Sequence, residues 1–140
     1  MAVPIISRLK DKVSDHTDRV VILDSPPGTA CPVVEVMRGS DFVLLVTEPT
    51  PFGLNDLKLA VETVRLIGLP FGVIINRDGV GDNSVETYLH HEKIPILLKI
   101  PQSQEIAKLY SDGIPFSKKL PYWPKEFKNI FKKIKSEVVK

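Results

Sequence analysis

The alternation of short apolar runs with longer stretches of helical period is the feature that most constrains the fold of this chain. Four runs, at residues 20–23, 42–47, 72–76 and 96–100, have the length of strands, and the first three are almost continuously apolar. Strands that are apolar along their whole length are typical of parallel sheets whose two faces are covered by helices. The pattern therefore predicts an open, mostly parallel α/β sheet with flanking helices, built as a single domain over residues 1–140.

The segments between these runs have the signals of helices. Residues 54–67 carry apolar side chains every three or four positions and are followed by Gly68, a residue that often ends helices. Asn83, with Glu86 as its capping-box partner, predicts the start of another helix. Residues 123–140 combine an apolar face with a lysine-rich face. This last pattern predicts a terminal helix that packs along the sheet, in preference to one that lies on an anionic membrane.

Charge, apolar content and cysteine count argue against nucleic-acid binding, a membrane span and secretion. The 140 residues are 43% hydrophobic, and 19 Lys and Arg stand against 17 Asp and Glu, so bulk charge gives no support to nucleic-acid binding. No apolar run approaches the roughly 20 residues that span a bilayer, so we expect no membrane span. The first residues lack the apolar core of a signal peptide, and a single cysteine allows no intramolecular disulfide. Both features favour a cytoplasmic location.

A carboxylate and a glycine follow the first apolar run. Ligands of open parallel sheets bind beyond the carboxyl ends of the strands, so residues at those ends are candidate site residues. Asp24 ends the run and is a fitting partner for hydrated Mg²⁺. The stiff turn at residues 25–28 places Gly28 where its N–H can approach a ligand closely, because no Cβ stands in the way. The alternative is an ordinary strand-to-helix turn in which Asp24 bonds to the backbone.

Cys31, His90 and His91 are residue types that can bind metals, so each is considered as a candidate site residue. Cys31 precedes Pro32, which places it in the first turn of a helix. A helix N-terminus acidifies a thiol, so a redox or metal role stays open, but a packed small residue is the preferred interpretation. His90 and His91 are adjacent, with no Asp or Cys placed to complete a metal site, and we expect both at the surface.

Three motifs occur in order at the ends of three successive expected strands: DSPPGT at 24–29, VTEPTPFGLNDL at 46–57 and GVIINR at 72–77. Together they resemble the MinD/ParA/Mrp family of deviant P-loop ATPases, most closely the MinD-like ATPases with an inserted ferredoxin domain. The resemblance extends over residues 20–116. It implies a P-loop NTPase fold, ATP and Mg²⁺ as cofactors, and ATP hydrolysis used as a switch. It also implies a nucleotide-sandwich homodimer and an iron–sulfur or metallocofactor client for the complete protein.

The resemblance implies one group of residues for the metal and the phosphates. Asp24 matches the acidic residue that holds the Mg²⁺ shell or orients the attacking water. Gly28 matches the glycine whose amide senses the γ-phosphate, and Pro27 belongs to the same nucleotide-binding turn. Thr47, Glu48 and Pro49 match a turn that lies near the nucleotide and the dimer face.

A second group of residues is implied for the base. Asn76 matches the residue that reads the adenine edge, and its side-chain amide offers both a donor and an acceptor. Arg77 is suited to stack on the base. Pro101, Gln102 and Ser103 match the segment that closes over the other side of the adenine. The alternative is that Asn76 and Arg77 only cap their strand and bridge to a neighbouring carboxylate.

The phosphate cradle of a P-loop ATPase is missing from the sequence. No G-x-x-x-x-G-K-[ST] and no KGG occurs in the 140 residues. Without those amides and that lysine, the triphosphate charge stays largely uncompensated. One explanation is that the chain is the C-terminal portion of an ATPase domain, inactive alone, with the loop and any ferredoxin insert, including its iron–sulfur cluster, before Met1. The other is a stand-alone, non-catalytic binding module that docks a protein partner.

Overall fold

The fold is built on three parallel strands in the order β1-β2-β3. The computed structural model describes residues 3–12 and 19–138. The strands are β1 (Val43–Thr47), β2 (Phe71–Asp78) and β3 (Ile96–Pro101). They confirm three of the four predicted strands and the predicted open parallel α/β sheet. The pairing of β1 with β2 is regular over its whole length, whereas the pairing of β2 with β3 contains two register shifts.

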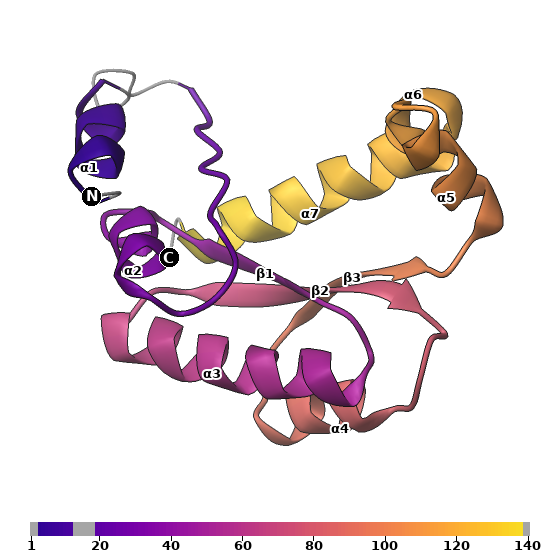
Figure 1. Ribbon diagram of the computed structural model, residues 1–140, viewed down its shortest axis with the longest axis horizontal. Helices are drawn as coiled ribbons and strands as arrows, with labels where there is room; N and C mark the ends of the chain where they lie inside the picture. The colour runs from indigo at the N-terminus through magenta and orange to yellow at the C-terminus, as the bar shows by residue number, and fades with distance from the viewer. Residues whose placement is uncertain (1–2, 13–18, 139–140) are drawn as a thin grey trace.

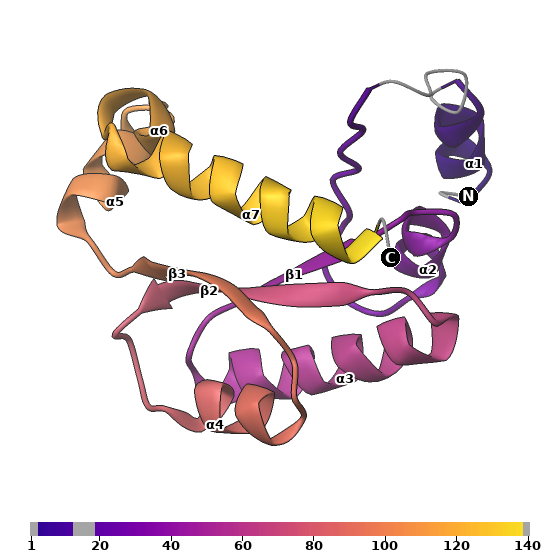
Figure 2. The same cartoon turned by 180° about the vertical axis from the view of Figure 1, so that it is seen from behind.

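Seven helices surround the sheet in the described part of the chain, as Figure 1 shows. Helices α3 and α4 lie on one face and α7 crosses the other, and Figure 2 shows the same layers from behind. None of the described helices is long and apolar enough to cross a membrane. The helices are α1 (Val3–Asp11), α2 (Cys31–Met37), α3 (Pro51–Ile67), α4 (Ser84–His91), α5 (Gln104–Ser111), α6 (Phe116–Lys119) and α7 (Tyr122–Val138).

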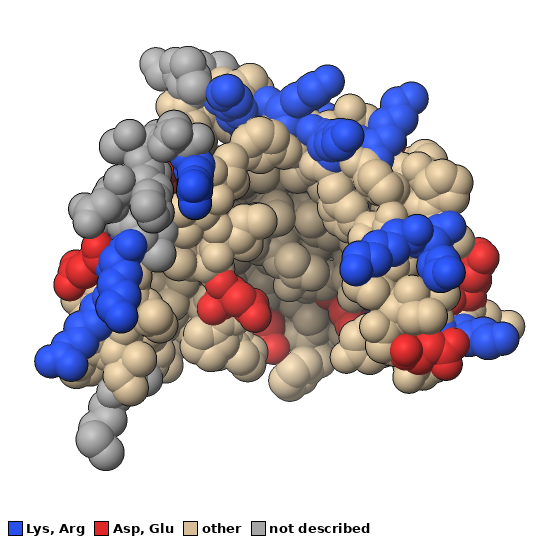
Figure 3. All heavy atoms as spheres, turned by 90° about the horizontal axis from the view of Figure 1, so that it is seen from above, with Lys and Arg blue, Asp and Glu red and all other residues tan. Residues whose placement is uncertain are grey.

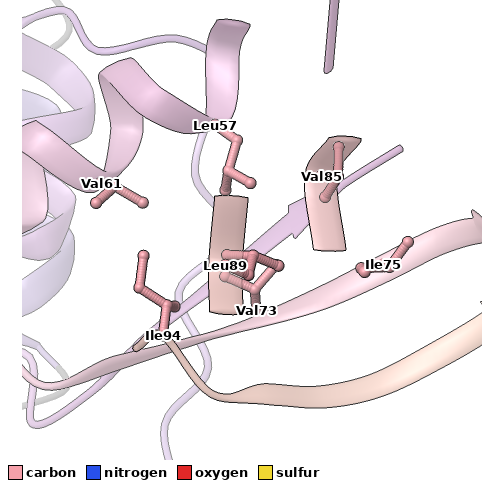
Figure 4. Packing of buried hydrophobic residues seen from close by; sticks show 7 residues of the cluster. All are labelled: Leu57, Val61, Val73, Ile75, Val85, Leu89 and Ile94. Atoms are coloured by element: carbon pink, nitrogen blue, oxygen red, sulfur yellow. The ribbon is translucent and has the colours of Figure 1, made fainter. Parts of the chain in front are cut away.

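The main core lies between the sheet and the α3–α4 layer. Val73 and Ile75 alternate along β2, so both point to the same face of the sheet, and both are fully buried. The helices meet them with side chains at spacings of three and four, as the sequence pattern predicts. Figure 4 shows the cluster, which consists of Leu57, Val61, Val73, Ile75, Val85, Leu89 and Ile94.

Helix α7 covers the opposite face of β2 and β3. Trp123 and Ile130 are buried against Ile74, Leu97 and Ile100. The Trp123 ring also meets Phe116 edge to face, with 5.2 Å between the ring centroids. The prediction of a terminal helix packed along the sheet is confirmed.

Local signals explain where α3 and α4 begin and end. Thr50 caps α3 by accepting a hydrogen bond from the Gly53 N–H, and Gly68 ends the helix in the left-handed region, as predicted. The predicted capping box of α4 is wrong. The side chain of Asn83 makes no cap, and the Asp82 carboxylate accepts from the Ser84 N–H instead. Glu86 turns to Lys99 on β3.

Residues 20–23, predicted as the first strand, form no strand in this structure. The side chains of Val20, Val21 and Ile22 are 64%, 43% and 89% exposed. A strand needs a neighbour for its backbone hydrogen bonds, and none of the described residues pairs with this segment. The prediction failed because apolar sequence specifies that a segment can be a strand, but not that its partner is present.

Helices α1 and α2 form a small unit beside the sheet. Lys10 Nζ donates to the carbonyls of Glu35 at 2.7 Å and Val36 at 3.1 Å, and also to that of Arg38. Cys31 begins α2 as predicted, but it is exposed, so the preferred interpretation as a packed small residue is wrong. The helix buries Val33, Val36 and Met37, and the position before Pro32 stays outside that face.

Candidate functional site

Side chains from the ends of all three strands meet at the carboxyl edge of the sheet. Arg77, near the end of β2, donates from Nε to Gln102 Oε1 at 3.0 Å. Its terminal nitrogen lies 3.3 Å from Glu48 Oε2. Glu48 directly follows β1 and Gln102 directly follows β3. One guanidinium therefore connects the two outer strand ends through the central strand.

The backbone of Arg77 is held in an unusual conformation. Its φ is 55°, in the left-handed region that non-glycine residues rarely adopt. Such a residue costs about 1–2 kcal/mol, and it persists only where surrounding contacts favour it. The Val80 N–H donates to the Arg77 carbonyl at 3.1 Å, which closes a turn directly after the bend. Strained residues of this kind cluster at binding sites.

Asn76 lies beside this arginine and is half-buried. Strand alternation places it on the same face of β2 as Ile74. Its carboxamide forms no hydrogen bond with any other described residue, so both its donor and its acceptor are available to a ligand. No contact within the described residues supports the alternative in which Asn76 caps its strand. Arg77, in contrast, does bridge to the neighbouring carboxylate of Glu48.

The turn after β1 is fixed by close packing. The Thr47 hydroxyl is buried and donates to the Gly53 carbonyl at 3.0 Å. A Cβ at Gly53 would lie 2.3 Å from the Glu48 carbonyl oxygen, and a Cβ at Gly81 would lie 2.1 Å from that of Pro49. Only glycine fits at either position. The Thr47–Pro49 turn is thus clamped between the start of α3 and the loop after β2.

Sequence reasoning missed Gly53 and Gly81 as parts of this site. For Gly81 the available signal was the pair of glycines in the sequence DGVGDN, because its contact with Pro49 joins two separate loops. It also missed Lys99, whose Nζ lies 2.7 Å from Glu86 Oε1 and 3.2 Å from Asp78 Oδ2. The hydrogen bond to Glu86, followed by that to Asp78, raises the pKa of Lys99. The amine therefore links β3 to both α4 and the end of β2.

The predicted phosphate-end residues Asp24, Pro27 and Gly28 are not brought to this edge. All three are exposed, and a Cβ at Gly28, where φ is 101°, would meet nothing within 4 Å. In Figures 1 and 2 the segment that leads into α2 passes the beginning of β1, not its carboxyl end. The expectation that Asp24 follows a strand at the carboxyl edge is therefore wrong for this structure.

The described residues contain no preformed cluster of metal ligands. No group of three or more His, Cys, Asp and Glu side chains is placed to hold an ion among them. His90 and His91 are exposed, as predicted. Mg²⁺ is commonly held by one or two carboxylates together with substrate phosphates. A single carboxylate such as Asp24 fits that kind of site only when a nucleotide is present.

Comparison with known proteins gives curated relatives and solved structures that resemble this chain. No protein-family model matches the chain. The chain is 37% identical over 114 residues to the uncharacterized protein MJ0579 of Methanocaldococcus jannaschii, a match that covers 81% of this chain and 39% of that protein. It is 23% identical over 131 residues to the uncharacterized protein MJ0578 of the same organism, covering 94% and 45%. The chain thus spans less than half the length of these relatives.

One of the similar solved structures is the cell division ATPase MinD of Pyrococcus furiosus. The two structures superpose with a TM-score of 0.68 at 28% sequence identity, over 96% of this chain and 57% of that one. The chain therefore has a MinD-like α/β fold, of the kind that nucleotide-binding ATPases use. The inserted ferredoxin domain and the C-terminal position of the chain stay predictions.

Proposed function

We propose that this chain is the C-terminal part of a MinD-like ATPase, and that it supplies the base-binding end of the nucleotide site. The observation that carries the proposal is the hydrogen bond of Arg77 to Gln102 at the carboxyl edge of a MinD-like sheet, directly after the half-buried Asn76, whose carboxamide bonds to no other described residue. Ligands of open α/β sheets bind at this edge. The half-buried carboxamide and the fixed guanidinium are the two kinds of group that recognise a purine base.

Each of these residues has a separate role in the proposal. The Asn76 carboxamide donates to one ring nitrogen of adenine and accepts from its exocyclic amino group. Arg77, oriented by Glu48 and Gln102, offers the flat face of its guanidinium to the ring. Pro101 and Gln102, which enter α5, close the other side of the base.

The phosphate end needs parts from outside this sequence. Asp24 would hold a Mg²⁺ ion, which neutralises phosphate charge, and the Gly28 N–H would donate to the γ-phosphate, with Pro27 stiffening the turn. These groups alone do not compensate a triphosphate, because the glycine-rich loop and its lysine are missing from the sequence. ATP hydrolysis is accordingly proposed only for a complete protein that contains that loop, and the isolated chain is proposed to be inactive.

The wider context also belongs to the proposal. The resemblance to ferredoxin-linked MinD-like ATPases supports a cytoplasmic ATP-dependent switch that forms a nucleotide-sandwich homodimer. It further suggests a client in iron–sulfur or metallocofactor assembly, with the cluster carried by an insert outside these residues.

The test is a calorimetric titration of Mg-ATP into the complete protein and its Asn76→Ala variant. Loss of the paired hydrogen bonds should weaken binding by about tenfold or more, since each such contact contributes on the order of 1 kcal/mol and an unpaired partner costs more. Asn55→Ala, at an exposed position of α3, is the matched control and should bind normally. Equal affinity of the Asn76→Ala variant and the parent would reject the base-binding role.

A further inference from the structure

The lysines of this chain differ in what they contact. Many lie on the outer side of α6 and α7, and Figure 3, which looks onto that side, shows Lys and Arg side chains around a hollowed, mostly uncharged centre. Lys99 comes from β3 and contacts the opposite layer. Its amine lies 2.7 Å from Glu86 Oε1 on α4 and 3.2 Å from Asp78 Oδ2 at the end of β2. One amine therefore connects three elements beside the candidate site.

Residues 76–77, which form the proposed base-binding pair, lie inside a β-bulge of the central strand. Ile75 on β2 pairs with Lys99 on β3. The next pair joins Asp78 to Pro101, so β2 advances three residues where β3 advances two. A bulge bends its strand and redirects side chains, and bulges are frequent beside active sites. The direction of the base-binding pair is therefore set by this bulge.

Lys99 spans the bulge from its beginning to its end. Its backbone pairs opposite Ile75, and its amine reaches the Asp78 carboxylate. In a regular strand the side chains of Ile75 and Asp78 would point to opposite faces of the sheet. The extra residue brings the Asp78 carboxylate to the face on which Lys99 meets Glu86. The ion pair between Lys99 and Asp78 therefore fits the bulged strand and not a regular one.

The end of the bulge is also joined to the groups that fix the Arg77 guanidinium. The Asp78 carbonyl accepts a hydrogen bond from the Gln102 N–H at 2.8 Å. The Gln102 side chain in turn accepts from Arg77 Nε at 3.0 Å. A displacement of Asp78 would thus move the backbone of Arg77, which directly precedes it, and also the side chain that orients the guanidinium.

We propose that Lys99 is a positioning residue for the base-binding end of the site. Resting on the proposed function, its amine holds Asp78 against β3 and α4, keeps the bulge in place and so directs Asn76 and Arg77 toward the base. The amine lies on the α4 side of the sheet, whereas strand alternation places Asn76 on the α7 side. Lys99 therefore acts through Asp78 and not by contact with the ligand.

The exposure of these ion pairs sets the size of the expected effect. The side chains of Lys99, Asp78 and Glu86 are 39%, 29% and 29% exposed. Ion pairs near the surface contribute little to stability, but two of them can shift a local conformational equilibrium by about threefold to tenfold. Removal of the Lys99 amine should accordingly change the geometry of the site more than the stability of the whole chain.

The first test observes Arg77 by NMR in the 140-residue chain. In Lys99→Met, exchange of the Arg77 Nε proton with water should become faster by about threefold or more, because its hydrogen bond to Gln102 loosens. Lys99→Arg keeps the charge and should restore the parent rate, and Lys108→Met, at an exposed position of α5, is the control. An unchanged rate in Lys99→Met would overturn the proposal. So would an equal acceleration at Arg65, which would indicate general loosening.

Variants of the two carboxylates separate positioning from simple attachment of β3 to α4. Asp78→Asn removes the contact that reaches the bulge and should reproduce the effect of Lys99→Met on Arg77. Glu86→Gln leaves the contact between Lys99 and Asp78 in place and should have a smaller effect. If Glu86→Gln reproduces the effect of Lys99→Met and Asp78→Asn does not, Lys99 only attaches β3 to α4 and the proposal is wrong.

Calorimetry on the complete protein connects this geometry to the nucleotide. Lys99→Met should weaken Mg-ATP binding by about threefold to tenfold and leave the binding of magnesium tripolyphosphate, which has no base, unchanged. Equal affinity of the parent and Lys99→Met for Mg-ATP would overturn the proposal, as would an equal loss for both ligands. If the parent binds no Mg-ATP but the Arg77 signal responds to Lys99→Met, the positioning of Arg77 is supported and the proposed nucleotide function is rejected.

Discussion

At the scale of single residues, the candidate site contains two positions with a left-handed backbone, Gly81 and Arg77. Gly81 combines a φ of 95° with a hypothetical Cβ 2.1 Å from the Pro49 carbonyl oxygen. Arg77 has a left-handed backbone conformation, and its side chain contacts both Glu48 and Gln102. Gly81 is required because a Cβ would overlap the Pro49 carbonyl, whereas the conformation of Arg77 is stabilised by its side-chain contacts.

Replacement of Gly81 by alanine should be costly for this reason. We expect Gly81→Ala to lower the free energy of unfolding by about 3 kcal/mol, because backbone strain of about 1–2 kcal/mol adds to a backbone overlap of similar size. Gly79→Ala is the control, since its φ of 97° is equally unfavourable but nothing lies within 4 Å of its Cβ. Urea unfolding measures both variants. Equal losses would show that the contact with Pro49 is unimportant.

At the scale of elements, the α3–α4 layer is joined by one ion pair at its end. Arg65, in the last turn of α3, lies 2.6 Å from Glu92, the residue that caps α4. The same guanidinium also donates to the Glu92 carbonyl at 3.2 Å. The hydrogen bond from Arg65, followed by that from His91, lowers the pKa of Glu92.

This ion pair predicts a pH dependence of stability. Because the pKa of Glu92 is lower in the folded than in the unfolded chain, its contribution is present above the ordinary carboxylate pKa and is lost as the pH falls through the folded value. Glu92→Gln should therefore be less stable than the parent at about pH 7 and equally stable in strong acid. Urea unfolding at both pH values measures this, with Glu62→Gln as control. A deficit that persists in acid would contradict the ion-pair interpretation.

At the scale of the whole molecule, two cores stabilise the two faces of the sheet. The α3–α4 core is broad, whereas the α7 side depends on a few large side chains around Trp123. Trp123 is 6% exposed and contacts the rings of Phe116, Tyr122 and Phe127. It fastens the beginning of the last helix to the sheet.

Removal of the Trp123 side chain should therefore weaken the packing of α7 on the sheet. We expect Trp123→Ala to lower the free energy of unfolding by about 3–5 kcal/mol, the usual effect of removing a buried large aromatic side chain. Tyr110→Ala, at a position 84% exposed, should change it by less than about 0.5 kcal/mol. Thermal and urea unfolding followed by circular dichroism compare the two variants. Similar stability of both would show that α7 is held by its other contacts.

Much of this organisation could be predicted from the sequence, because runs such as 42–47 and 72–76 carry their strand signal locally. The base-binding role of Asn76 and Arg77 comes from the family resemblance of the motif GVIINR and stays a prediction. Residues 20–23 carry an equally clear signal but pair with none of the described residues, so the strand does not form. The clamp at Gly81 was missed because it joins two loops, and local patterns do not report contacts between them.

The sequential order of the strands has a consequence for how the protein is made. Each strand pairs with the next one along the chain, so β1, β2 and β3 can assemble as they leave the ribosome, without waiting for distant segments. The carboxyl-edge cluster of Glu48, Arg77 and Gln102 is complete once β3 has joined. The contact between Arg77 and Gln102 can therefore form only after β3 has been synthesised.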